Sequence, residues 1–188
     1  MAGNIKKFFK ANNFPWVTFK KYWKNSSRSE LITDVFLPFL LSSVLIWWTS
    51  YYISDFKDLV SKFRDLSGQV IAAISILAGF NLTSITVISA IGDNVKKLRN
   101  QQTSSGNSVY DILVIFFTWA VSIQLIVVFL SILLYYIGSL VPTNLIMAIP
   151  VWAWVCATVW LAITAHSILI SIRNLKTLFL YVTYDPDR

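Results

Sequence analysis

Polar side chains inside long apolar stretches are the residues of this chain best placed to do chemistry. Asn81, Gln124 and His166 lie within such stretches, and the single Cys156 shares a stretch with His166. Polar groups at membrane depth are costly and are therefore functional candidates. A proton relay or transport site normally adds a carboxylate or a positive charge near the midplane, and these stretches contain neither there. We therefore favour hydrogen bonds between neighbouring helices as their role.

Catalytic arrangements are not evident in the sequence. One His and one Cys do not make a metal site by themselves, no glycine-rich phosphate loop is present, and no nucleophile has a base and an orienting partner at a recognisable spacing. Asp34 and Asp111 fall where apolar stretches begin, and a carboxylate there would cap a helix and complement its dipole. We expect no enzymatic activity, no catalytic residue, no metal and no cofactor.

Four apolar stretches must hold these side chains. They cover residues 34–53, 69–91, 110–137 and 143–172, and they contain no Lys, Arg or Glu. Each is near or beyond the roughly 20 residues that a helix needs to cross the hydrocarbon. Lipid offers no hydrogen-bond partner to the backbone, so such segments become helices. The sequence predicts an all-α membrane protein whose domain 34–172 has four transmembrane helices in two hairpins.

The basic residues predict how the chain is oriented. Thirteen of the sixteen Lys and Arg residues lie in the arm 1–33, in the loop after the second stretch, or in the tail 173–188. By the positive-inside rule both termini are cytoplasmic, as in a bacterial inner membrane, although other membranes obey the same rule.

The basic residues flanking the membrane, interleaved with aromatic residues in the arm, predict a cytoplasmic platform. Its members are Lys6, Lys7, Lys10, Lys20, Lys21, Lys24, Arg173 and Lys176. This composition suits contact with anionic lipids, and it would also suit an acidic protein or a nucleic acid. Beside a membrane we favour lipids and expect no direct binding of nucleic acid. The platform as a whole either docks a soluble partner or coats the inner leaflet.

The connection over residues 54–67 has helical periodicity, with one apolar face and one charged face. The apolar residues are Phe56, Leu59, Val60, Phe63 and Leu66. Gly68 would end this helix before the second span. We expect a short amphipathic helix on the outer leaflet or against a neighbouring subunit, with an exposed sensor as the alternative.

Small side chains form a narrow stripe along the second span. At helical spacing the stripe consists of Ala72, Ser75, Gly79, Thr83, Thr86 and Ala90. Small residues let helix backbones approach closely, so the stripe predicts a helix-packing or oligomer seam. A pore or groove lined by the same hydroxyl groups is the alternative.

Two hairpins, both termini inside and a small-residue second span, QVIAAISILAGFNLTSITVIS, resemble the four-span membrane subunits of prokaryotic antiphage defence systems. In size and layout the chain is similar to the KwaA-like membrane subunit of the Kiwa system. The resemblance covers the whole chain as architecture. It implies a homo-oligomer, with a tetramer as the expected form, that senses disturbance of the envelope and works with a cytoplasmic KwaB-like partner acting on phage DNA.

The leading functional hypothesis is therefore an oligomeric sensor and scaffold that recruits or regulates a cytoplasmic partner. A pore-forming effector that depolarises the membrane is the second hypothesis, and leakage of ions or dye would distinguish it. An immunity protein or transport accessory protein is the third, and it would need a cognate toxin or substrate.

Overall fold

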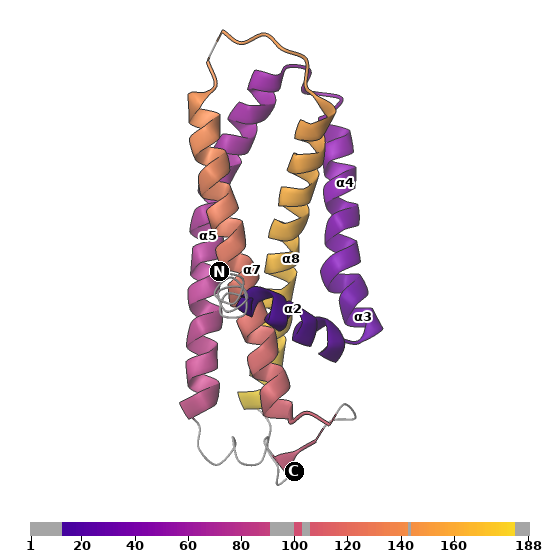
Figure 1. Cartoon of the computed structure of the whole chain (residues 1–188), viewed down its shortest axis with the longest axis vertical. Helices are drawn as coiled ribbons and strands as arrows, with labels where there is room; N and C mark the ends of the chain where they lie inside the picture. Colours follow the sequence, from indigo (N-terminus) through magenta and orange to yellow (C-terminus); the bar gives the residue numbers. More distant parts are fainter. Residues whose placement is uncertain (1–12, 91–99, 103–105, 143, 183–188) are drawn as a thin grey trace, which may run out of the picture.

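The chain folds as a bundle of long helices crossed near one end by a short one. The computed structural model describes residues 13–90, 100–102, 106–142 and 144–182. The elements are α2 (Phe14–Asn25), α3 (Arg28–Leu31), the π-helical η1 (Ile32–Phe36), α4 (Leu37–Thr49), α5 (Phe56–Ala90), α7 (Val109–Leu140) and α8 (Val151–Val182). Figure 1 shows α2 lying across the lower half of the bundle, where α3 begins.

Within the described residues, four helices are long and apolar enough to cross a membrane, which confirms the predicted all-α, multi-pass architecture. The first runs continuously from Arg28 to Thr49 through α3, η1 and α4. The other three, α5, α7 and α8, each have more than 30 residues. At 1.5 Å per residue they are longer than about 45 Å, so they extend beyond a hydrocarbon core of roughly 30 Å.

The beginning of the first spanning helix is set by local chemistry. Ser27 Oγ accepts a hydrogen bond from the Glu30 backbone N–H, and Glu30 accepts one from the Ser27 backbone N–H, which together make a capping box. Pro38 lacks a backbone N–H, so it cannot bond the carbonyl of Asp34 four residues earlier. The preceding turn is the π-helical η1, in which the Leu37 N–H bonds the Ile32 carbonyl.

The two short connections, 50–55 and 141–150, produce the two hairpins in chain order, but the helices do not pack only within them. The most extensive contact is between α5 and α7, and α4 packs chiefly on α8. In Figure 1, α5 and α7 cross each other on one side of the bundle, α4 lies on the other side, and α8 lies between them. This arrangement leaves α4 supported mainly by one neighbour along its length.

The separate amphipathic helix predicted over 54–67 is wrong. Gly68 lies inside α5, which continues without interruption from Phe56 to Ala90. The apolar face is covered by the same chain: Leu59 is only 3% exposed, Phe56 contacts Trp152, and Phe63 contacts Trp160 with ring centroids 5.6 Å apart. Val60 lines a groove between α5, α7 and α8. Leu66 is partly exposed. Periodicity revealed the apolar face but not which surface covers it.

The predicted start of the fourth span at residue 143 is also wrong, because α8 begins at Val151. Pro150 precedes it, and proline restricts the residue before it to extended backbone. Part of the connection pairs with the start of α5, where the Phe56 N–H donates to the Met147 carbonyl at 2.9 Å. In α2, Pro15 occupies the first turn, so it initiates this helix.

Two helical glycines give a matched test of the α5–α7 contact. A Cβ added at Gly138 would lie 2.9 Å from Arg64 Cβ, whereas one added at Gly68 would lie 3.7 Å from Tyr135 Cε2, an ordinary contact distance. We expect Gly138→Ala to lower the free energy of unfolding by about 1–2 kcal/mol through overpacking. Gly68→Ala should be neutral or raise it by up to about 1 kcal/mol through helix propensity. Thermal unfolding in detergent measures both, and equal melting temperatures would contradict this contact.

Candidate functional site

A buried ion pair joins the first and last spanning helices. Asp34, on η1, is 2% exposed and pairs with the guanidinium of Arg173 on α8, whose side chain is 15% exposed. Tyr22, on α2, donates its phenolic proton to Asp34 Oδ2 at 2.9 Å. Two neighbouring segments near the start of the chain and the distant α8 therefore converge on one carboxylate.

Aromatic rings enclose the charge of Arg173. Its guanidinium carbon lies 4.6 Å from the Phe116 ring centroid and 5.4 Å from the Tyr22 ring centroid. Such contacts stabilise a desolvated cation through the ring quadrupole. Burial, and then the negative charge of Asp34, hold the pKa of the Tyr22 phenol above its ordinary value. Tyr22 therefore stays protonated and remains a donor to Asp34.

His166 uses the carbonyl that Pro38 leaves unbonded. Its Nδ1 contacts the backbone carbonyl oxygen of Asp34, which can only accept, so Nδ1 carries the proton. Its Nε2 then accepts a hydrogen bond from the Trp119 indole N–H at 3.3 Å. The neutral imidazole thus bridges α7 and η1 from α8, which is the helix-bridging role that the sequence favours for it.

A second polar cluster lies among α5, α7 and α8. Asn81 Nδ2 donates to Gln124 Oε1 and to Ser171 Oγ, each at 3.1 Å, and Gln124 Nε2 donates to Ser171 Oγ at 2.6 Å. Asn81 and Gln124 are fully buried. Hydrogen bonds across membrane helices each contribute roughly 0.6 kcal/mol and at most about 1.7 kcal/mol. These bonds fix how the three helices are rotated against one another.

The small-residue stripe lies outside this core. Its six residues, Ala72, Ser75, Gly79, Thr83, Thr86 and Ala90, are all exposed. The Thr83 and Thr86 hydroxyl groups donate to carbonyls of their own helix. The buried face of α5 instead carries Ile74, Asn81 and Ser84. Packing among the described residues of one chain therefore leaves the stripe uncovered.

The basic platform is divided by the structure. Lys20, Lys21 and Lys24 on α2 and Lys176 on α8 are exposed. Including Arg173 in the platform is wrong, because its charge is paired with Asp34 inside the protein. Lys6, Lys7 and Lys10 lie outside the described residues.

The interpretation of Asp34 as a helix cap is also wrong, since the helix begins at Arg28 and Asp34 lies nearly two turns later. Sequence reasoning missed Tyr22, Trp119 and Ser171 as partners of the buried polar groups. One signal was available: Asp34 and Arg173 are opposite charges beside apolar stretches, and both fall at the same predicted membrane face. Among the described residues, no three His, Cys, Asp or Glu side chains gather in a metal-binding arrangement.

Removing one partner of the ion pair tests directly how much the pair contributes to the free energy of unfolding. Asp34→Ala leaves Arg173 buried without its counter-charge, which costs about 3–5 kcal/mol in comparable buried pairs. The double variant Asp34→Asn with Arg173→Gln carries no buried charge and should recover part of that loss. Chemical denaturation in detergent micelles measures the free energy of unfolding for each.

The exposed pair Arg64–Asp65 provides the matched control, with side chains 38% and 61% exposed. Asp65→Ala should change the free energy of unfolding by less than about 1 kcal/mol. If Asp34→Ala lowers the free energy of unfolding by no more than Asp65→Ala does, the buried pair does not stabilise the fold.

Comparison of the chain with protein-family models, curated proteins and solved structures yields no match.

Proposed function

We propose that this protein is an oligomeric membrane scaffold and sensor that transmits a change at the membrane to a cytoplasmic partner. In this proposal, the end of the bundle that carries α2 lies on the cytoplasmic side of the inner membrane. The excess of Lys and Arg in the segments at this end supports that orientation. The role requires no chemical reaction by this chain. It requires a surface for self-assembly and a rigid link between the membrane interface and the segment that meets the partner.

The exposed stripe on α5 is the observation that supports self-assembly of the protein. Six small residues follow one helix face, and none is covered by the helices that the structure describes. Small side chains allow two helix backbones to approach closely, which is the main source of helix association in lipid. A second copy of the chain is the occupant proposed for this face.

The link is supported by the Asp34 ion pair. Asp34 joins α2 and η1, at the level where the first spanning helix begins, to Arg173 on α8. Beyond Arg173, α8 continues to Val182 with Lys176 exposed. A displacement of α2 would therefore move the last turns of α8, the part proposed to meet a soluble protein.

The proposed setting is a prokaryotic antiphage defence complex with a KwaB-like cytoplasmic subunit, and it rests on the resemblance of the architecture. Anionic lipids at the Lys residues of α2 are the other proposed partners. Disturbance of the membrane is the proposed trigger.

Assembly is tested by enlarging the stripe. Gly79→Leu adds a side chain where close approach is needed, so we expect the oligomer to dissociate at least partly. Ala73→Leu is the control, because Ala73 is exposed on the same helix but off the stripe. Mass measurement of the purified protein in mild detergent reads out both variants, and an unchanged oligomer in Gly79→Leu would contradict the seam.

The scaffold is distinguished from a pore in the same preparation. We expect a stoichiometric soluble protein to co-purify from the native host, and vesicles containing the assembly to retain a trapped dye. Dye leakage without a bound partner would contradict the scaffold and favour the pore-forming effector.

A further inference from the structure

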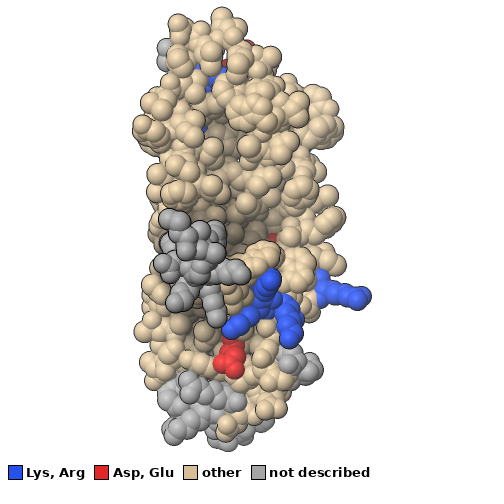
Figure 2. All heavy atoms as spheres, viewed as in Figure 1, with Lys and Arg blue, Asp and Glu red and all other residues tan. Residues whose placement is uncertain are grey.

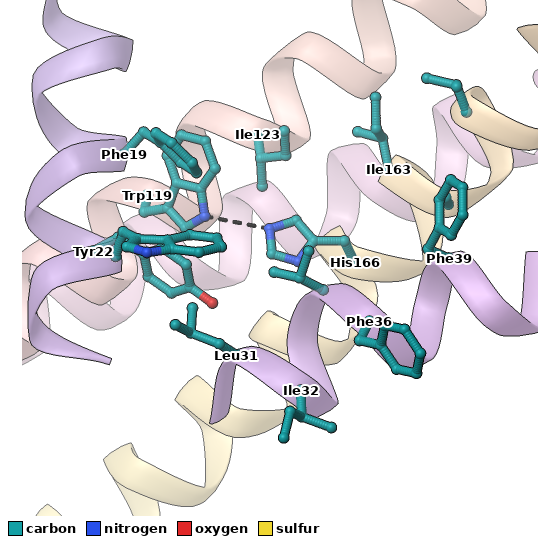
Figure 3. A pocket seen from close by; sticks show the side chains of 14 residues that line it. Phe19, Tyr22, Leu31, Ile32, Phe36, Phe39, Trp119, Ile123, Ile163 and His166 are labelled. Carbon is teal, nitrogen blue, oxygen red and sulfur yellow. Dashed lines mark hydrogen bonds between the residues drawn. The ribbon is translucent and has the colours of Figure 1, made fainter. Parts of the chain in front are cut away.

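An open apolar cavity lies beside the Asp34 ion pair. It has a volume of about 730 Å³ and lies among α2, η1, α4, α7 and α8. This volume is within the range of small-molecule sites, about 300–1,000 Å³. Figure 3 shows Phe19 and Trp119 on one side of the cavity, Phe36 and Phe39 on the other, and the imidazole of His166 between them.

The polar side-chain atoms of Tyr22, Trp119 and His166 beside this cavity are already engaged with protein partners. The Tyr22 hydroxyl donates to Asp34, and the Trp119 indole N–H donates to His166 Nε2. The remaining ring nitrogen of His166 contacts the Asp34 carbonyl. A stable internal water needs two to four polar partners, which these groups do not provide. The cavity is therefore suited to an apolar occupant.

The cavity opens toward the lipid. Several of its aromatic and aliphatic side chains are largely exposed: Trp23 by 47%, Ile32 by 59%, Phe36 by 61% and Phe39 by 53%. The last three belong to the first spanning helix, so the opening adjoins the hydrocarbon of a bilayer. The material nearest to the opening is an acyl chain.

Charge beside the opening selects the kind of lipid. The helix α2, which contributes Phe19, Tyr22 and Trp23 to the cavity wall, also carries exposed Lys20, Lys21 and Lys24. Figure 2 shows Lys and Arg side chains gathered over α2 and α3, next to an almost uncharged surface of the spanning helices. Lys residues near the membrane surface attract anionic headgroups.

We propose that this cavity is a binding site for one acyl chain of an anionic phospholipid, with the phosphate held by the lysines of α2. The apolar chain enters between α2 and the first spanning helix and ends against the rings of Trp119 and His166. The headgroup stays at the interface, where Lys20 and Lys24 lie one turn apart on α2. The site does not depend on the oligomer seam, since none of its lining residues belongs to the stripe on α5.

The test uses the full chain in vesicles doped with a phospholipid that carries a photoreactive diazirine on its acyl chain. One probe has a phosphatidylglycerol headgroup and the other phosphatidylcholine. We expect crosslinks at Phe36, Phe39 and Ile163, with about tenfold more labelling from phosphatidylglycerol because of the lysines. Mass spectrometry of peptides locates the crosslinks.

Two matched variants refine the test. Val159→Trp fills part of the cavity and should reduce its labelling severalfold, whereas Val155→Trp, one turn away on α8 and outside the lining, should not. Replacing Lys20, Lys21 and Lys24 with Gln should abolish the headgroup preference. Replacing Lys57 and Lys62, at the other end of the bundle, should preserve it.

Several results would overturn the proposal. Absence of cavity crosslinks in the unmodified protein would exclude an acyl chain, and equal labelling by the two headgroups would exclude the lysine contact. Labelling that appears only when Gly79→Leu disperses the oligomer would identify a second copy of the chain as the occupant. The comparison of headgroups needs no substitution, so it stands even if Val159→Trp does not fold.

Discussion

The arrangement of this protein depends on a single buried carboxylate. The Asp34 carboxylate pairs with Arg173 and accepts a hydrogen bond from the Tyr22 hydroxyl. The backbone carbonyl of Asp34 accepts a hydrogen bond from His166. Charge in a low-dielectric interior is tolerated only when it is paired and hydrogen bonded. The need to compensate Asp34 therefore fixes the positions of α2, η1 and α8 together, and it places Trp119 on α7 through His166.

Pro38 makes this arrangement possible through what it lacks. Without an N–H at residue 38, the Asp34 carbonyl has no partner in a regular helix. In the π-helical turn η1 this carbonyl instead contacts His166 on α8. Such π-helical insertions occur frequently at functional sites. The same turn also lines the proposed lipid cavity, through Ile32, Val35 and Phe36. An occupant of the cavity would therefore press on the segment that holds the ion pair.

The sequence predicted the spanning helices well because hydropathy and charge are local properties. It predicted that polar residues would bridge helices, but not that Asn81 and Gln124 share Ser171, because that contact joins positions up to 90 residues apart. The apolar face at Leu59 was visible, yet its burial against α7 and α8 depends on how the chain folds back. Arg173 was assigned to the surface for the same reason: its partner lies near the opposite end of the chain.

The central claim is that the Asp34 pair holds α2 against α8, and a distance distribution tests it most directly. Spin labels at Lys24→Cys on α2 and Lys176→Cys on α8, both exposed, would be placed in a chain with Cys156→Ala. With the labelled protein diluted in an excess of unlabelled protein, so that distances within one chain dominate, pulsed electron paramagnetic resonance in lipid bilayers should give one narrow distance distribution, which broadens when Asp34 is replaced by Asn. An equally narrow distribution at the same distance in the Asp34→Asn protein would contradict the account.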